Sequence, residues 1–206
     1  MNILIVGGAG YIGSHVVLEA LDNGHTITVF DDLSTGNINN INKNIVFIQG
    51  STLFKEDLKS VMESSNFDAV IHLAASKAAG ESMKKPDEYA ENNILGGVNL
   101  INACIKKNIK AFIFSSTAAV YGKPKYIPID ENHILNPSNF YGFTKFIIEK
   151  NLKWFHKLKN LHFASLRYFN AAGYDVKKRI SCLEMNPQNL IPKVMETIYG
   201  SRKQIN

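Results

Sequence analysis

The chain has few cysteines and no long hydrophobic run. Its two cysteines, Cys104 and Cys182, lack the spacing of a metal site, and two such thiols predict a reduced cytoplasmic protein without bound metal. No apolar stretch approaches the roughly 18 residues of a membrane helix. Residues 1–8 have no basic segment before a few apolar residues, which indicates a strand rather than a signal peptide. We therefore expect a cytoplasmic location and no membrane partner.

Acidic residues are scarce toward the C-terminus. Residues 145–206 hold 12 of the 23 Lys and Arg residues but 4 of the 18 Asp and Glu residues. A basic segment of this kind can bind nucleic acid or phosphate, but here the charges are scattered along predicted helices without interleaved aromatic residues. We expect a solvated surface and no nucleic-acid partner.

Strand and helix patterns alternate along the whole chain. Continuous apolar runs predict strands at 3–6, 26–30, 45–48, 69–73, 111–114 and 163–169. Helical spacing begins at Ile12, and further helices are predicted at 55–63, 86–107, 140–157 and 187–199. The segments 37–44, 123–137 and 174–186 have the composition of loops. This alternation predicts an α/β fold, a Rossmann-type doubly wound parallel sheet that binds ligands at the carboxyl ends of its strands.

A glycine-rich turn joins the first strand to the first helix. Its spacing is Gly7-x-x-Gly10-x-x-Gly13, and Asp31 ends the second strand 18 residues after Gly13. Glycines let the backbone approach a pyrophosphate, whose charge is favoured at a helix N-terminus. A carboxylate at Asp31 can accept both ribose hydroxyls and would repel a 2′-phosphate. The pattern predicts a site for NAD rather than NADP.

Tyr141 and Lys145 open the helix predicted at 140–157. Residues four apart share one face of a helix, so both side chains can reach the same cleft. A phenol with its ordinary pKa of about 10 is a poor base at neutral pH, and a neighbouring ammonium lowers that pKa. Taken alone, the pair is more often a packed aromatic beside a surface cation. With a dinucleotide site before it, we interpret the pair as a base and its tuning cation.

Other polar residues follow the predicted strands. Lys77 lies among small residues after the fourth strand, where it is a candidate contact for phosphate or ribose. Ser51 lies in a turn that could line an adenine pocket. Ser115 and Thr117 follow the fifth strand, where a hydroxyl can bind a substrate oxygen or relay a proton, although a turn of small residues explains Ser115 equally well. Asn92 falls on a helix, where the residue type alone says little.

Together these stretches resemble the extended short-chain dehydrogenase/reductase superfamily, and within it the UDP-glucose 4-epimerases. The matching segments are 7–15, 31–34, 77–82, 114–122, 141–145 and 167–170. The resemblance implies an NAD-binding domain over residues 1–173. It also implies that residues 174–206 are only the beginning of a smaller C-terminal substrate lobe, because chains of that family continue further.

The resemblance also implies which residues hold NAD. These are Gly7, Gly10, Tyr11, Ile12, Gly13, Asp31, Asp32, Ser34, Ser51, Lys77, Asn92, Ser115, Tyr141, Lys145 and Tyr168. One position departs from the family pattern, since Ser51 stands where an Asp usually meets the adenine amino group. Serine can still form a hydrogen bond, so we expect weaker NAD binding rather than its loss.

By the same resemblance, the chemistry is epimerisation at C4 of a UDP-hexose through a transient 4-keto sugar. Tyr141 takes the proton of the 4-hydroxyl, Thr117 hydrogen-bonds that hydroxyl, and Lys145 binds the nicotinamide ribose and lowers the tyrosine pKa. Asn170 and Asn189 match positions that hold the nucleotide sugar. Relatives pair through helices equivalent to 86–107 and 140–157, which implies a homodimer.

Three alternatives to a UDP-glucose/UDP-galactose epimerase follow from the sequence. A related dehydratase needs an acid pair directly after the equivalent of Thr117, whereas Ala118 and Ala119 follow here and cannot protonate a leaving hydroxyl. An epimerase for UDP-N-acetylhexosamine or UDP-uronate stays open. So does a chain that binds NAD without turnover.

Overall fold

The protein is built on a six-stranded parallel sheet in the order β3-β2-β1-β4-β5-β6. The computed structural model describes residues 1–180 and 190–204. The four inner strands, β1, β2, β4 and β5, are apolar and mostly buried, as expected of parallel strands covered on both faces, whereas the edge strands β3 and β6 are half-buried to exposed. The order reverses between β1 and β4, which is the switch point where α/β sheets bind ligands. The strands are β1 Asn2–Val6, β2 Thr26–Asp31, β3 Val46–Gln49, β4 Ala69–His72, β5 Ala111–Ser115 and β6 His162–Leu166.

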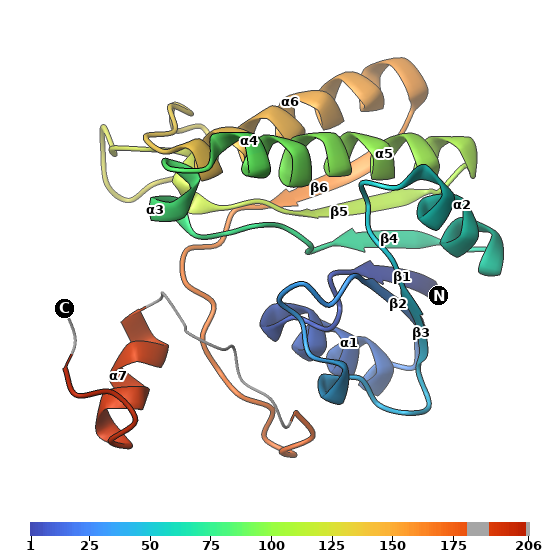
Figure 1. The fold of residues 1–206 in the computed structure, drawn as a ribbon. Coiled ribbons are helices and arrows are strands. Elements are labelled where there is room, and N and C mark those ends of the chain that lie inside the picture. The colour runs from blue at the N-terminus through green and yellow to red at the C-terminus, as the bar shows by residue number, and fades with distance from the viewer. Residues whose placement is uncertain (181–189, 205–206) are drawn as a thin grey trace.

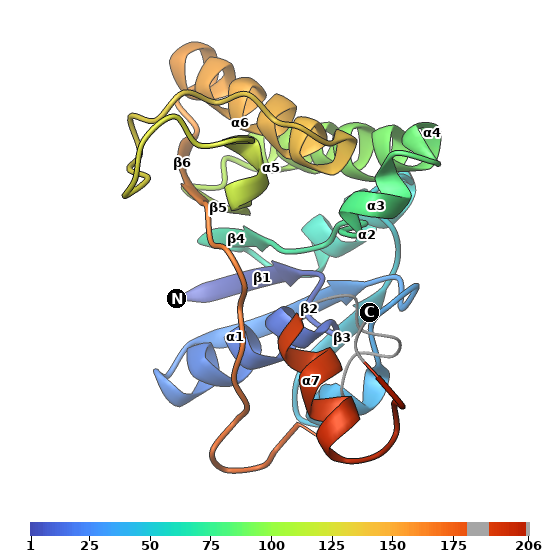
Figure 2. The same ribbon diagram turned by 90° about the vertical axis from the view of Figure 1, so that its left-hand side faces the viewer.

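Helices cover both faces of this sheet, as Figures 1 and 2 show. One layer contains α2, α4, α5 and α6, and α1 lies on the opposite face. The predicted doubly wound fold is therefore confirmed. The longer helices are α1 Tyr11–Asp22, α2 Lys55–Ser64, α5 Gly96–Lys106 and α6 Phe140–Lys159, and the short ones are α3 Ala79–Ser82 and α4 Pro86–Tyr89.

The hydrophobic core follows these two layers. The larger cluster lies between the sheet and α2, α5 and α6, and includes the fully buried Leu100, Phe112 and Ile148. The smaller cluster joins α1 to β1 and β2 through Val17 and Val29. Burial at about 25 cal/mol per Å² of apolar surface is the main force that holds these layers together. The core therefore fixes the strand ends, where the polar residues of interest lie.

The helix predicted over 86–107 is continuous but not uniform. It consists of α4, a π-helical stretch over Ala90–Leu95 and α5. π-helical stretches are rare in proteins, and those that occur inside α-helices often lie at functional sites. The predicted strand at 163–169 was wrong at its C-terminal end, because β6 stops at Leu166. Arg167 and Tyr168 leave the sheet and direct their side chains to Glu149 and Ser115.

Three smaller differences concern predicted loops and the last helix. The loop predicted over 37–44 contains a 3-10 turn over Ile38–Asn40. A second such turn, Ala118–Val120, follows β5. The last helix, α7, spans Leu190–Ile198, and the predicted start at 187 lies outside the described residues. Figure 1 shows α7 away from the sheet, at the end of the chain that leaves β6.

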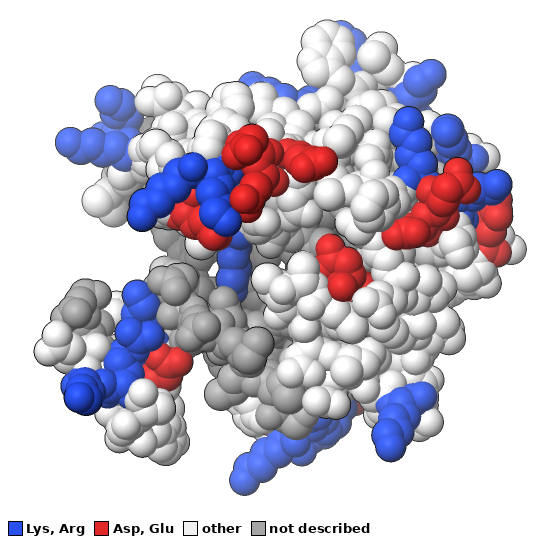
Figure 3. Space-filling view, viewed as in Figure 1, with Lys and Arg blue, Asp and Glu red and all other residues white. Residues whose placement is uncertain are grey.

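Charged side chains are distributed over the surface in separate groups. On the face seen in Figure 3, Lys and Arg side chains occur in several places, some beside acidic side chains and others without an acidic neighbour. In the basic C-terminal segment, Lys150, Lys153 and Lys157 are exposed as expected, whereas Lys145 is buried and Arg167 is half-buried. In the described part of the chain, no helix combines the length and apolar character that a membrane span needs.

Gly13 tests the packing of α1 against the glycine turn. A Cβ at this position would lie 2.0 Å from the carbonyl oxygen of Gly7, so the turn would have to move. We expect Gly13→Ala to lower the free energy of unfolding by roughly 1–3 kcal/mol, the usual cost of overpacking. Urea unfolding measures it. Gly80→Ala is the control, because nothing lies within 4 Å of its Cβ position. Equal effects of both substitutions would show that the close approach does not matter.

Candidate functional site

The glycine turn lies where β1 meets β4. Gly7 has a φ of +86°, and a Cβ there would lie 2.4 Å from the backbone nitrogen of Ala74. Its N–H donates to the carbonyl of Phe30, at 2.8 Å. The turn is therefore held by β2 on one side and approaches the end of β4 on the other. A side chain at Gly7 would collide with the backbone after β4, so the tight turn here requires glycine.

Asp31 supports the same turn from the end of β2. Its Oδ2 accepts the N–H of Ala9 and its Oδ1 accepts the N–H of Leu33, each at 2.9 Å. Burial raises the pKa of this carboxyl, while the two backbone hydrogen bonds oppose the rise. Each carboxylate oxygen has a second lone pair, so Asp31 can fix the turn and still accept ribose hydroxyls. The next residue, Asp32, is exposed and accepts the N–H of Ser34 at 2.9 Å.

The predicted Ser51 site contains a carboxylate after all. Ser51 is half-buried in the turn after β3, and its N–H donates to Oδ2 of Asp57 at 2.9 Å. Asp57 lies in the first turn of α2, where an acidic residue is favoured by the helix dipole. Sequence reasoning missed Asp57, because its place at this turn depends on how α2 packs.

Asn93 is a second residue that the sequence did not single out. Its Oδ1 accepts the N–H of Ser76 at 2.9 Å, and its Nδ2 donates to the carbonyl of Ser76 at 2.9 Å and to Oγ1 of Thr144 at 3.0 Å. The predicted Asn92 donates to Oγ of Ser76 at 3.0 Å. Both asparagines therefore hold the loop that carries Lys77, whose own side chain is exposed. Two consecutive asparagines of the π-helical stretch therefore contact this loop.

Tyr141 lies in the first turn of α6, and two neighbouring side chains fix that turn. Asn139 accepts the N–H of Gly142 at 2.8 Å as an N-cap, and Oγ of Ser82 accepts the N–H of Tyr141 at 3.0 Å. Burial raises the pKa of the Tyr141 phenol to about 12, although a hydrogen bond with Thr117 opposes the rise. The structure thus brings two of the three predicted catalytic residues, Tyr141 and Thr117, into direct contact.

Lys145 is buried one turn further along α6, with 2% of its surface exposed. Its Nζ donates to the carbonyl of Ser115 at 2.9 Å, and lies 4.9 Å from the ring centroid of Phe114 and 6.0 Å from that of Tyr141. Burial lowers the pKa of Lys145 to about 7. Burial, not Lys145, is the main influence on the phenol pKa here, and the expectation that a charged Lys145 lowers that pKa stays a prediction. Desolvation dominates both groups, and each is driven toward its neutral form.

The remaining predicted residues at the end of β5 lie beside this pair. Oγ of Ser115 and the hydroxyl of Tyr168 form a hydrogen bond. Thr117 caps the 3-10 turn that follows, because its Oγ1 accepts the N–H of Ala119 at 3.1 Å. The N–H of Ala118 donates to the carbonyl of Tyr168 at 3.0 Å. The ends of β5, β6 and α6 therefore present one continuous group of hydroxyls, a phenol and an ammonium.

Two further residues, Asn170 and Asn189, are predicted to bind the nucleotide sugar. Asn170 is exposed just beyond this group, in the segment that leaves β6. Asn189 lies outside the described residues. The structure therefore tests neither role.

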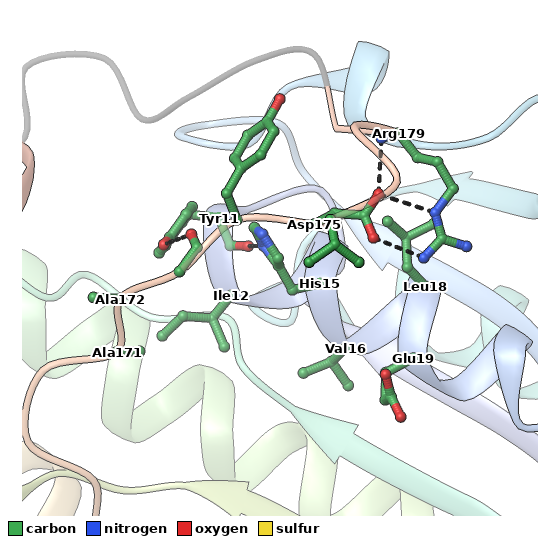
Figure 4. Close-up of a pocket in the computed structure, with 13 residues that line it drawn as sticks. Tyr11, Ile12, His15, Val16, Leu18, Glu19, Ala171, Ala172, Asp175 and Arg179 are labelled. Carbon is green, nitrogen blue, oxygen red and sulfur yellow. Dashed lines mark hydrogen bonds and ion pairs between the residues drawn. The ribbon is translucent and has the colours of Figure 1, made fainter.

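A separate hollow lies on the far side of α1, between that helix and residues 171–179 (Figure 4). The hydroxyl of Tyr11 donates to the carbonyl of Gly173 at 2.5 Å, and Arg179 bridges Asp175 and Asp22. These contacts tie the segment to α1. Although Tyr11 and Ile12 line the hollow, the other predicted residues do not. We therefore place the functional site at the carboxyl ends of the strands.

A doubly wound parallel sheet with a glycine turn, an acidic residue after β2 and a Tyr–Lys pair on α6 defines a dinucleotide-binding protein of the dehydrogenase class. A family model agrees with this class: the NAD dependent epimerase/dehydratase family matches residues 3–205. The chain belongs to this family.

Named relatives narrow the comparison. The UDP-glucose 4-epimerase of Halalkalibacterium halodurans is 40% identical over 205 residues, covering 100% of this chain and 61% of the relative. The UDP-glucose 4-epimerase from Brucella ovis in complex with NAD superimposes with a TM-score of 0.95 at 38% identity, covering 99% of this chain and 62% of that one.

A solved structure named for a different UDP-sugar is also similar to this chain. The UDP-N-acetylglucosamine 4-epimerase from Methanobrevibacter ruminantium M1, in complex with UDP-N-acetylmuramic acid, has a TM-score of 0.85 at 34% identity. It is covered over 63% of its length, and this chain over 97%. The chain thus spans somewhat more than three fifths of the length of the relatives it matches.

The buried ammonium of Lys145 makes a pH-dependent prediction. Its pKa is about 7 in the folded protein against an ordinary 10.5, so the folded chain binds fewer protons than the unfolded chain between these values. The cost of burying the charge is full below pH 7 and falls as the pH rises toward 10.5. This group should therefore raise the free energy of unfolding by up to about 1.4 kcal/mol per pH unit in that window.

Urea unfolding of Lys145→Met against wild type from about pH 6 to 10 measures this contribution. The variant should be the more stable at low pH, and the two curves should converge as the pH rises. Lys150→Met, at an exposed position on the same helix, is the control. A constant difference between Lys145→Met and wild type at all pH values would contradict the prediction.

Proposed function

We propose that this chain forms the NAD-binding part of a UDP-sugar 4-epimerase that interconverts UDP-glucose and UDP-galactose. The observation that carries the proposal is the contact of Thr117 with Tyr141, beside the buried Lys145, at the strand ends that also hold the glycine turn. A chain that only binds a dinucleotide has no need of a phenol, a hydroxyl and an ammonium in this arrangement.

The residues present fit NAD. A Cβ at Gly10, the N-cap of α1, would have only the carbonyl oxygen of Gly7 near it, at 3.5 Å, so the backbone at the start of α1 is open to a pyrophosphate. Asp31 offers carboxylate oxygens to the adenine ribose. Lys77 and Asn92 would meet phosphate and ribose, and Asp57 beside Ser51 offers a carboxylate near the adenine. When bound, NAD supplies a hydride acceptor and donor for C4 of the sugar. An NAD complex of the Brucella ovis relative supports this assignment.

Proton transfer is the part that this chain performs with its own side chains. Tyr141 would take the proton of the sugar 4-hydroxyl, while Thr117 holds that hydroxyl and Tyr141 in line. Burial disfavours an isolated phenolate and an isolated ammonium alike, but the two charges stabilise each other when they form together. Lys145 would therefore take up a proton as Tyr141 gives up its own, and the phenolate would then take the proton of the 4-hydroxyl. The phenol would return that proton when the 4-keto sugar is reduced.

The residues after Thr117 favour epimerisation over dehydration. Ala118 and Ala119 form the 3-10 turn at this point, and neither can protonate a leaving hydroxyl. Among sugars, UDP-N-acetylhexosamine is the second candidate, because a UDP-N-acetylglucosamine 4-epimerase is 34% identical to this chain. UDP-uronate stays open as an expectation of the sequence.

Tyr141→Phe tests the proposed base. In a chain supplied with NAD and UDP-galactose, we expect UDP-glucose as product, and the variant should lose about 10²–10⁴-fold in kcat, the usual contribution of a general base. Chromatography of the nucleotide sugars measures the product. Tyr126→Phe removes the same hydroxyl from an exposed loop residue and should keep the wild-type rate. Full activity of Tyr141→Phe would disprove its role.

The same assay separates the alternatives. Conversion of UDP-N-acetylglucosamine or UDP-glucuronate in preference to UDP-galactose would change the assigned substrate. NAD binding with no product from any of these sugars would leave the chain as a cofactor-binding unit.

We also propose a homodimer through the helices at 86–107 and 140–157. Large apolar side chains are exposed on both, with Leu95 at 49% and Trp154 at 60%. Burying such residues is the usual driving force for a four-helix contact. Sedimentation velocity should therefore show a dimer in wild type and a monomer in Leu95→Glu/Trp154→Glu. Ile127→Glu, exposed in a loop, is the control. A monomeric wild type would disprove the contact.

A further inference from the structure

Two oppositely charged residues of α6 are buried one turn apart. Lys145 is 2% exposed and Glu149 is 1% exposed. Their spacing of four places the Cβ atoms about 5–6 Å apart, a distance at which lysine and glutamate commonly pair. Their charged ends also reach consecutive residues: Lys145 donates to the carbonyl of Ser115 at 2.9 Å, and Oγ of Ser116 donates to Glu149 at 2.5 Å. A direct ion pair between the two would be the ordinary result.

Glu149 forms its ion pair with Arg167 instead. The arginine Nε donates to Oε1 of Glu149 at 2.9 Å, and its Nη2 donates to Oε2 at 2.6 Å. The planar guanidinium thus binds both carboxylate oxygens, which a lysine ammonium cannot do in the same way. Tyr121 holds Arg167 in place through a hydrogen bond at 3.2 Å and a ring contact at 5.2 Å. With the hydroxyl of Ser116 added, three donors satisfy Glu149.

We propose that Arg167 is a positioning residue that keeps Glu149 from capturing Lys145, so that the ammonium stays directed at Ser115 and Tyr141. The inference rests on the proposed function, in which Lys145 is the cation of the site. Without Arg167, a buried carboxylate and a buried ammonium would lie one helical turn apart. Glu149 would keep only the hydroxyl of Ser116 as a donor, and pairing with Lys145 would relieve the cost of a buried carboxylate without a cation.

The groups around Lys145 show which of them could form an ion pair with it. From β4 comes His72, which burial holds neutral by lowering its pKa to about 3. From β5 come the Ser115 carbonyl and the Phe114 ring, and from α6 comes Tyr141. Glu149, one turn further along α6, is the carboxylate of that helix. A Lys145 paired with it would be held as an ammonium before any proton leaves Tyr141, and the coupling between phenol and amine would be lost.

The test compares Arg167→Met with the double variant Glu149→Gln/Arg167→Met. The single variant frees Glu149 to pair with Lys145, whereas the double variant removes the carboxylate as well. We follow the titration of Lys145 by NMR of chain labelled with ¹³C at the lysine ε-carbon, with the signal assigned by its absence in Lys145→Met. We expect the single variant to raise the Lys145 titration by about one pH unit or more. The double variant should return it to the wild-type value.

A merely structural role for Arg167 gives a different pattern. It predicts that the Lys145 titration is unchanged in a folded single variant, or that the double variant is disturbed as much as the single one, and either result overturns the proposal. If Arg167→Met does not fold by circular dichroism, Arg167→Lys replaces it. A lysine there satisfies one carboxylate oxygen at a time, so an intermediate upward shift supports the proposal and an unchanged titration overturns it.

The titration requires no turnover, which separates this inference from the proposed function. Absence of product from UDP-galactose in wild type would count against the epimerase while leaving the Lys145 titrations interpretable. Ser165→Ala is the matched control, because its Oγ lies near Arg167 in sequence and has no hydrogen-bond partner among the described residues. It should leave the Lys145 titration unchanged.

Discussion

Burial of an ammonium group is the constraint on which the site depends. Lys145 projects from α6 into the space behind the ends of β4 and β5, where the carbonyl of Ser115 and the ring of Phe114 receive it. Burying a charge in an apolar interior costs free energy, and this cost lowers the pKa of Lys145 to about 7. The surrounding core must therefore be rigid enough to keep the amine in place. The buried layer of Leu100, Phe112 and Ile148 provides that rigidity.

The same burial acts on Tyr141 with the opposite sign, since it raises the phenol pKa to about 12. Burial therefore favours the neutral phenol and the neutral amine alike. This property follows from the depth of the site rather than from any single contact. Burial of the phenol therefore opposes any lowering of its pKa by a neighbouring ammonium.

Much of the fold followed from the sequence because it depends on local patterns. The six strands, the glycine turn and Asp31 could be predicted from apolar runs and glycine spacing alone. Asn93 and Arg167 could not be assigned roles in this way. Each acts through partners far along the chain, Ser76 and Thr144 for Asn93, and Glu149 for Arg167. Such contacts depend on which elements lie side by side, and neither periodicity nor residue type records that.

The shortened β6 shows how the fold and the site are connected. Residues 163–169 have the apolar and aromatic character of a strand, yet pairing with β5 stops at Leu166. Two further backbone bonds, from Ser116 to Leu166 and from Ala118 to Tyr168, keep the chain beside the end of β5. Leaving the ladder lets Arg167 reach Glu149 and Tyr168 reach Ser115. Local strand propensity is therefore overridden at this point by the tertiary contacts of these two side chains.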